Sequence, residues 1–92
     1  MNEGRGKYQI LISKDARKIL QKLPKNLLGR ISKAIDGLAG NPRPEGCKKL
    51  EGYDNLYRIR VGDWRISYAI EAERLVVLVI EVAPRGGAYR KL

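Results

Sequence analysis

Hydrophobic and polar residues alternate strictly along residues 56–70, and this pattern predicts a β-hairpin. Before the Gly62-Asp63 turn, tyrosine, isoleucine and valine alternate with Arg58 and Arg60. After the turn, Arg65 and Ser67 alternate with large apolar residues. Successive side chains of a strand point to opposite sides. One face of the hairpin is therefore apolar, whereas the other carries three guanidinium groups and the Ser67 hydroxyl.

The residues before the hairpin predict one strand and two helices. Residues 8–13 alternate in hydrophobicity, which is typical of a strand. Apolar residues then recur every three or four positions up to Leu23, which indicates a short helix capped by Ser13 and stopped by Pro24. Residues 25–39 carry a second apolar stripe. Because the connection at the proline is short, the two helices are expected to form an antiparallel hairpin.

The residues after the hairpin predict a last strand. Residues 75–83 are a nearly continuous apolar run, which is typical of a central strand buried on both sides. The single charge of this run, Glu81, is expected to share a side with Val77, Val79 and Ala83. Pro84 is expected to end regular strand pairing.

This order of elements predicts an α+β fold. An N-terminal strand, a helical hairpin and a three-stranded antiparallel meander would form one small sheet, covered on one face by the helices. The three arginines would lie on the opposite, concave face. Ninety-two residues are too few for two cores, so residues 1–92 are expected to form a single domain with residues 1–6 frayed.

The charge of the chain favours polyanionic partners. Lys and Arg number 19 against 10 Asp and Glu, which gives a net charge of +9 and a pI near 10.0. Such a domain suits nucleic acid, the ribosome or an acidic protein. No apolar run approaches the roughly 20 residues that span a membrane. The sequence therefore predicts a cytoplasmic protein with no membrane partner.

The composition also restricts the chemistry. The chain has no histidine, and Cys47 is its one cysteine. Histidine-based acid-base catalysis and the usual zinc sites are excluded, and we expect no metal and no cofactor. Cys47 is expected to be a bystander thiol. The arginine-bearing face is then either an ordinary solvated face or a surface that binds an anion.

Three segments decide between these interpretations. They are Lys49-Leu50-Glu51-Gly52, the hairpin Leu56–Tyr68, and the ending Val82-Ala83-Pro84-Arg85-Gly86-Gly87-Ala88-Tyr89. In sequence and order they resemble the RelE family of bacterial and archaeal toxins, within the RelE/ParE superfamily of type II toxin-antitoxin systems. The resemblance extends from Tyr8 to the C-terminus and implies a RelE/ParE-like fold.

The resemblance implies an endoribonuclease (mRNA interferase) that enters the ribosomal A site, cleaves messenger RNA and inhibits translation. The family's catalytic positions fall on Arg58, Arg60, Arg65, Arg85 and Tyr89. Such residues suit attack of a ribose 2'-hydroxyl on the adjacent phosphate, with guanidinium groups stabilising the developing charge and the tyrosine stacking on a base. The best-known bacterial members carry lysine at the first two positions, and no general base is evident here.

The resemblance also implies partners. A cognate RelB-like antitoxin would wrap the toxin and neutralise its basic site, and the pair would bind operator DNA only through the antitoxin. Contacts to the ribosome and messenger RNA are predicted for Lys48, Lys49, Arg90 and Lys91.

Two other functions stay open on the sequence. One is a ParE-like inhibitor of DNA gyrase, which would share the fold without nuclease activity. The other is a nonenzymatic module that binds RNA or the ribosome through phosphate contacts alone.

Overall fold

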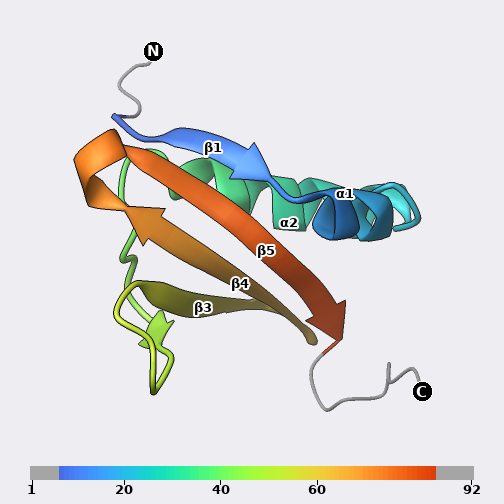
Figure 1. Cartoon of the computed structure of the whole chain (residues 1–92). Coiled ribbons are helices and arrows are strands. Elements are labelled where there is room, and N and C mark those ends of the chain that lie inside the picture. The colour runs from blue at the N-terminus through green and yellow to red at the C-terminus, as the bar shows by residue number, and fades with distance from the viewer. Residues whose placement is uncertain (1–6, 85–92) are drawn as a thin grey trace.

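The computed structural model describes residues 7–84 as a twisted sheet with two α-helices on one side (Figure 1). The predicted α+β class is confirmed. In chain order the elements are β1 (Gln9–Ile12), α1 (Lys14–Leu20), α2 (Lys25–Gly37), β2 (Lys48–Lys49), β3 (Leu56–Val61), β4 (Trp64–Glu71), the 3-10 helix η1 (Ala72–Arg74) and β5 (Val76–Pro84). No helix in this part of the chain is long and apolar enough to cross a membrane.

The sheet has the strand order β1-β5-β4-β3-β2. The pair β1 and β5 is parallel, and every other pair is antiparallel, so the predicted meander of the last three long strands is confirmed. The short strand β2 was not predicted. It consists of two residues in the turn-rich connector, Lys48 opposite Arg58 and Lys49 opposite Tyr57, and so gives no periodic signal of its own.

The helical hairpin forms as predicted, with one shifted boundary. The Ser13 hydroxyl oxygen accepts a hydrogen bond from the Ala16 backbone N–H at 3.1 Å, which confirms the predicted N-cap. However, α1 ends at Leu20, three residues before the predicted Leu23. Pro24 then serves as the N-cap residue of α2, with an extended ψ of 150°.

The hairpin turn is the predicted one. Val61 pairs with Trp64 across the two residues Gly62 and Asp63. Gly62 has a φ of 60°, whereas Asp63 has a negative φ, as in turns of type II'. A glycine at the first turn position therefore lets a two-residue loop fix the register of β3 against β4.

One hydrophobic core lies between the helices and the sheet. Tyr68 is fully buried, donates a hydrogen bond to the Pro42 carbonyl at 2.8 Å and stacks on Tyr57 with ring centroids 6.1 Å apart. The remaining buried side chains come from both helices and three strands: Ala16, Leu20, Ile31, Ile35, Ile59, Ile66, Ile70, Val77, Val79 and Val82, with Leu38 just after α2. The apolar stripes of the predicted helices are therefore core, as expected.

A β-bulge in β5 changes the predicted direction of Glu81. Tyr68 pairs with Val79 but Ser67 pairs with Glu81, so Ile80 is an extra residue that has no partner on β4. The prediction that Glu81 shares a side with Val77 and Val79 is wrong, because this extra residue reverses the alternation. Glu81 is exposed on the face of the sheet away from the helices.

The same bulge limits the burial of β5. The strand lies between β1 and β4, as predicted for a central strand, and it ends at Pro84. Burial on both sides holds only near its two ends, since Ile80 and Glu81 are exposed in the middle.

Candidate nucleic-acid interface

The face of the sheet away from the helices, called the outer face here, carries charged residues in two rows. Lys48, Arg58, Ser67 and Glu81 are consecutive partners across β2, β3, β4 and β5. The second row joins Arg60 to Arg65 and Arg65 to Ala83. Paired residues of adjacent strands project from the same face, so the three predicted arginines of the hairpin share one surface.

A third row on the outer face is apolar. Leu11, Leu78, Ala69 and Leu56 are consecutive partners from β1 to β3. Leu11 is 41% exposed, although it is a large aliphatic side chain. The outer face therefore changes from apolar near the start of β5 to basic near its end.

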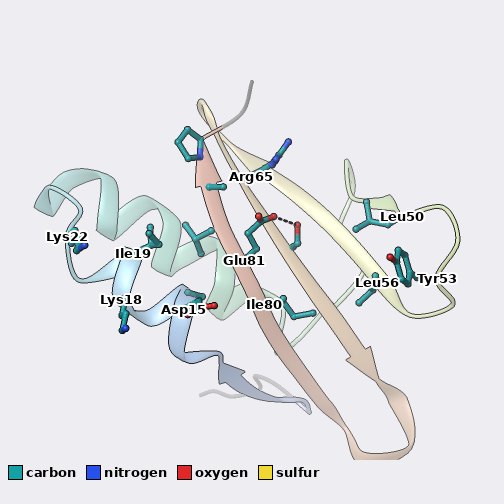
Figure 2. Close-up of a pocket in the computed structure, with 15 residues that line it drawn as sticks. Asp15, Lys18, Ile19, Lys22, Leu50, Tyr53, Leu56, Arg65, Ile80 and Glu81 are labelled. Atoms are coloured by element: carbon teal, nitrogen blue, oxygen red, sulfur yellow. Dashed lines mark hydrogen bonds between the residues drawn. The ribbon is translucent and has the colours of Figure 1, made fainter. Parts of the chain in front are cut away.

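A groove of about 900 Å³ crosses the outer face (Figure 2). Its floor includes Arg65, Ser67 and Glu81 on neighbouring strands, one wall is α1, and the other includes Tyr53 in the loop after β2. The Ser67 hydroxyl donates a hydrogen bond to the Glu81 carboxylate at 3.3 Å, drawn as the dashed line in Figure 2. The groove thus joins a cation, a hydroxyl and a carboxylate on one floor.

Arg65 has an unusual environment in this groove. Its side chain is half-buried, and its Nε is buried with no hydrogen-bond partner among residues 7–84. A buried donor without an acceptor costs about 1 to 3 kcal/mol, more when it is charged. Because the Nε itself is shielded from the groove, only the more exposed part of the half-buried side chain could bind an anion there.

Arg58 and Arg60 line a second, smaller hollow of about 380 Å³, called the β3 hollow here. Lys48 and Glu45 complete its charged lining. Arg65 lies in the groove and not in this hollow, although it is paired with Arg60. The structure therefore brings the three arginines to one face but divides them between two depressions.

The other predicted site residues have different positions. Lys48 is beside Arg58 on the outer face, whereas Lys49 pairs with Tyr57, which faces the core, and so projects from the opposite face. Arg85, Tyr89, Arg90 and Lys91 lie outside the described residues. Pro84, the last residue of β5, pairs with Trp64 and lines the groove that contains Arg65.

Sequence reasoning missed Glu81 as a member of this surface, whereas the alternation of the hairpin placed Ser67 there correctly. The residue pattern does not predict the bulge, because Ile80 continues an apolar run. The signal that was available is the isolated acid itself, since an unpaired carboxylate is rarely buried in a strand.

Two other titratable side chains among residues 7–84 lie outside this surface. Tyr68 is no base for catalysis, because its burial raises the pKa of its hydroxyl well above the ordinary value. Cys47 is a half-buried free thiol. Within residues 7–84, no three Cys, Asp or Glu side chains are grouped to hold a metal ion.

Sequence comparison relates this chain to known toxins. The family model described as ParE toxin of type II toxin-antitoxin system, parDE, matches residues 10–89. The protein named Toxin RelE of Mycobacterium tuberculosis is 31% identical over 84 residues, which cover 90% of this chain and 87% of that protein.

Two solved structures share the fold. In the archaeal RelE-RelB complex from Pyrococcus horikoshii OT3, the matching chain is 36% identical with a TM-score of 0.78, covering 88% of this chain and 98% of that chain. The isolated RelE toxin of E. coli is 27% identical with a TM-score of 0.77, covering 86% and 85%. The chain therefore belongs to the RelE/ParE superfamily of type II toxins. Within it, this protein is a RelE-family toxin of a toxin-antitoxin system.

Proposed function

We propose that this toxin is a ribosome-dependent endoribonuclease that cleaves messenger RNA in the ribosomal A site and so inhibits translation. The observation that carries the proposal is the convergence of Arg58, Arg60 and Arg65 on the outer face, in a fold shared with RelE toxins. Arg58 and Arg60 are next-but-one neighbours on β3, and Arg60 faces Arg65 directly. Like charges on paired strands repel, so a bound polyanion offsets a cost that the free sheet bears.

The reaction is attack of the ribose 2'-oxygen on the adjacent phosphorus. The O2'–P bond forms and the P–O5' bond breaks, which leaves a cyclic phosphate and a 5'-hydroxyl. Negative charge grows on the phosphoryl oxygens during this step, and the half-buried Arg65 side chain lines the groove. One well-placed donor to such an oxygen is worth about 3 to 4 kcal/mol. Arg65 is therefore assigned to stabilise the charge on the phosphoryl group.

The neighbouring residues have roles in holding the RNA. Arg58, Arg60 and Lys48 line the β3 hollow and are assigned to the phosphates beside the cut. Arg85 and Tyr89, assigned by the family resemblance, follow Pro84 in the sequence but lie outside the described residues; Pro84 itself lines the groove that holds Arg65. Arg85 would act with Arg65 on the phosphoryl group, and Tyr89 would stack on a base.

In this proposal, positioning by the ribosome compensates for the small number of acid-base groups in the protein. The chain has no histidine, and arginine stays protonated in proteins, so its own set of acid-base groups is small. A ribosome that holds the message in a fixed geometry replaces much of this chemistry by positioning. The proposal therefore places the protein in the cytoplasm, with slow cleavage of free RNA.

The proposed protein partner is a RelB-like antitoxin. Several solved neighbours are RelE toxins bound to RelB, including complexes from P. horikoshii, E. coli and M. tuberculosis. On this chain, the apolar row that begins at Leu11, together with Ile80 and Tyr53, exposes large hydrophobic side chains beside the cations. A partner segment with one apolar side and several acids would suit this surface. Operator DNA would then be bound through the antitoxin.

A second function, inhibition of DNA gyrase, is favoured by one finding. The matching family model is that of ParE toxins. The same fold without nuclease activity would suffice to inhibit gyrase. The paired arginines would then bind a protein or DNA surface.

Mapping cut sites on a defined message in a purified translation system separates these functions. The nuclease proposal predicts cuts phased with codons that appear only when ribosomes are present. Intact message, combined with accumulation of gyrase-linked DNA breaks, would favour the ParE-like function. Salt-sensitive ribosome binding without cuts would indicate a nonenzymatic module.

A further inference from the structure

The bulge in β5 places a carboxylate among the cations of the outer face. Because Ile80 is an extra residue, Ile80 and Glu81 both line the groove, and Glu81 pairs with Ser67. Bulges of this kind recur beside active sites, where they redirect a side chain. Here the redirected side chain is the one acid on the floor of the groove.

The bulge is held by a contact from α1. The Ser13 hydroxyl donates a hydrogen bond to the Ile80 carbonyl at 2.9 Å and accepts one from the Ala16 N–H. The backbone N–H of Ser13 also donates to the Val79 carbonyl at 2.9 Å. One residue thus fixes both the start of the helix and the two residues that precede Glu81, so the position of the carboxylate is set by the fold.

The charges around Glu81 place it close to the proposed reaction centre. Ser67, which donates to Glu81, is flanked on its other side by Arg58, and Arg65 is two residues before it on the same face of β4. Diagonal neighbours of this kind have Cα atoms about 7 to 8 Å apart. This span accommodates a ribose whose phosphate binds Arg65 and whose 2'-hydroxyl faces Glu81.

We propose that Glu81 is the general base of the cleavage reaction, an inference that rests on the proposed nuclease function. The Glu81 carboxylate takes the proton from the ribose 2'-hydroxyl as the O2'–P bond forms. The P–O5' bond breaks, and a water molecule protonates the leaving 5'-oxygen. Glu81 then returns its proton to solvent, so no other reactant is consumed. This assignment supplies the base that the arginine set lacks.

Asp15 is the other carboxylate that lines the groove, and it is less suited to this role. It lies in the first turn of α1, on the wall of the groove, where the helix N-terminus favours a fixed negative charge. Glu81 lies on the floor, between the rows that contain Arg58 and Arg65. Among residues 7–84, the charged groups near Glu81 are Arg58 and Arg65 on the neighbouring strands, and Asp15, Lys18 and Lys22 on the α1 side of the groove.

The test is single-turnover cleavage of a ribosome-bound message by the full-length protein. Glu81→Gln keeps the shape of the side chain and removes the base. It is expected to cut about a hundredfold or more slowly, while ribosome binding is unchanged. The matched control, Glu73→Gln, removes an equal charge from exposed η1 and is expected to cut like the wild type.

Two failures can be told apart. If the wild-type protein leaves ribosome-bound message intact, the nuclease proposal fails and the role of Glu81 fails with it. If the wild type cuts, and Glu81→Gln cuts within threefold of it, only the role of Glu81 is overturned. Tighter ribosome binding by Glu81→Gln with an unchanged cutting rate would show that the carboxylate merely balances the arginines.

Discussion

The two faces of the sheet are built from the same strands but have different roles: one packs in the core, and the other carries the candidate site. On the helix-covered face, Ile59, Ile66 and Val82 are consecutive partners and are almost fully buried. One residue along each strand, Arg60, Arg65 and Ala83 are also consecutive partners, and they form the basic end of the outer face. Stability and function are therefore interleaved residue by residue, and a one-residue slip in register would exchange them.

The largest effect on stability is expected in the hydrophobic core, on the helix-covered face of the sheet. Ile66 is completely buried beside Arg65 in the sequence, and Ile66→Ala would leave a cavity in the core. We expect the free energy of unfolding to fall by about 2 to 5 kcal/mol, measured by urea denaturation. A loss below 1 kcal/mol would contradict the difference between the two faces.

A smaller effect is expected at the buried hydroxyl of Tyr68. Tyr68→Phe leaves the Pro42 carbonyl without its donor, which is expected to cost about 1 to 3 kcal/mol.

The same variant tests a pH dependence. Burial raises the pKa of Tyr68 in the folded protein above its ordinary value of 10.0. The unfolded chain therefore loses this proton first, and the contribution of Tyr68 to stability is complete below pH 10 and declines as the pH rises above it. The decline approaches about 1.4 kcal/mol per pH unit. Tyr68→Phe should unfold with a correspondingly weaker dependence between pH 10 and 11, and equal slopes in the two proteins would contradict this account.

The smallest effect on stability is expected on the outer face. Ser67 neighbours Ile66, but its hydroxyl lies on the open side of the sheet, where it donates a hydrogen bond to the Glu81 carboxylate. Ser67→Ala should change the free energy of unfolding by less than about 1 kcal/mol. A loss as large as that of Ile66→Ala would show that the outer face is part of the stable core.

The same interleaving explains what the sequence could predict. Alternation in residues 56–70, the apolar stripes of the helices and the Ser13 cap all arise from local periodicity, and the structure confirms them. The sharing of one face by Arg58, Arg60 and Arg65 followed from the same alternation.

Features without a local pattern were not predictable. The bulge at Ile80 depends on a contact from Ser13, which is 67 residues away in sequence, so the direction of Glu81 was predicted wrongly. Leu75 adopts a left-handed φ of 56° after η1, a conformation that aliphatic residues rarely adopt. Strand β2 is too short to show alternation, so the opposite directions of Lys48 and Lys49 were invisible in the sequence.

The most direct test of the central claim is the single-turnover cleavage rate of ribosome-bound message by Arg65→Ala, compared with Arg74→Ala. Both changes remove one guanidinium group, but Arg74 is exposed in η1, outside the groove. We expect Arg65→Ala to cut about a hundred to a thousandfold more slowly, as for loss of one oxyanion donor, with unchanged ribosome binding. Arg74→Ala should cut like the wild type. Equal rates for the two variants would contradict the assignment of the outer face as the site of cleavage.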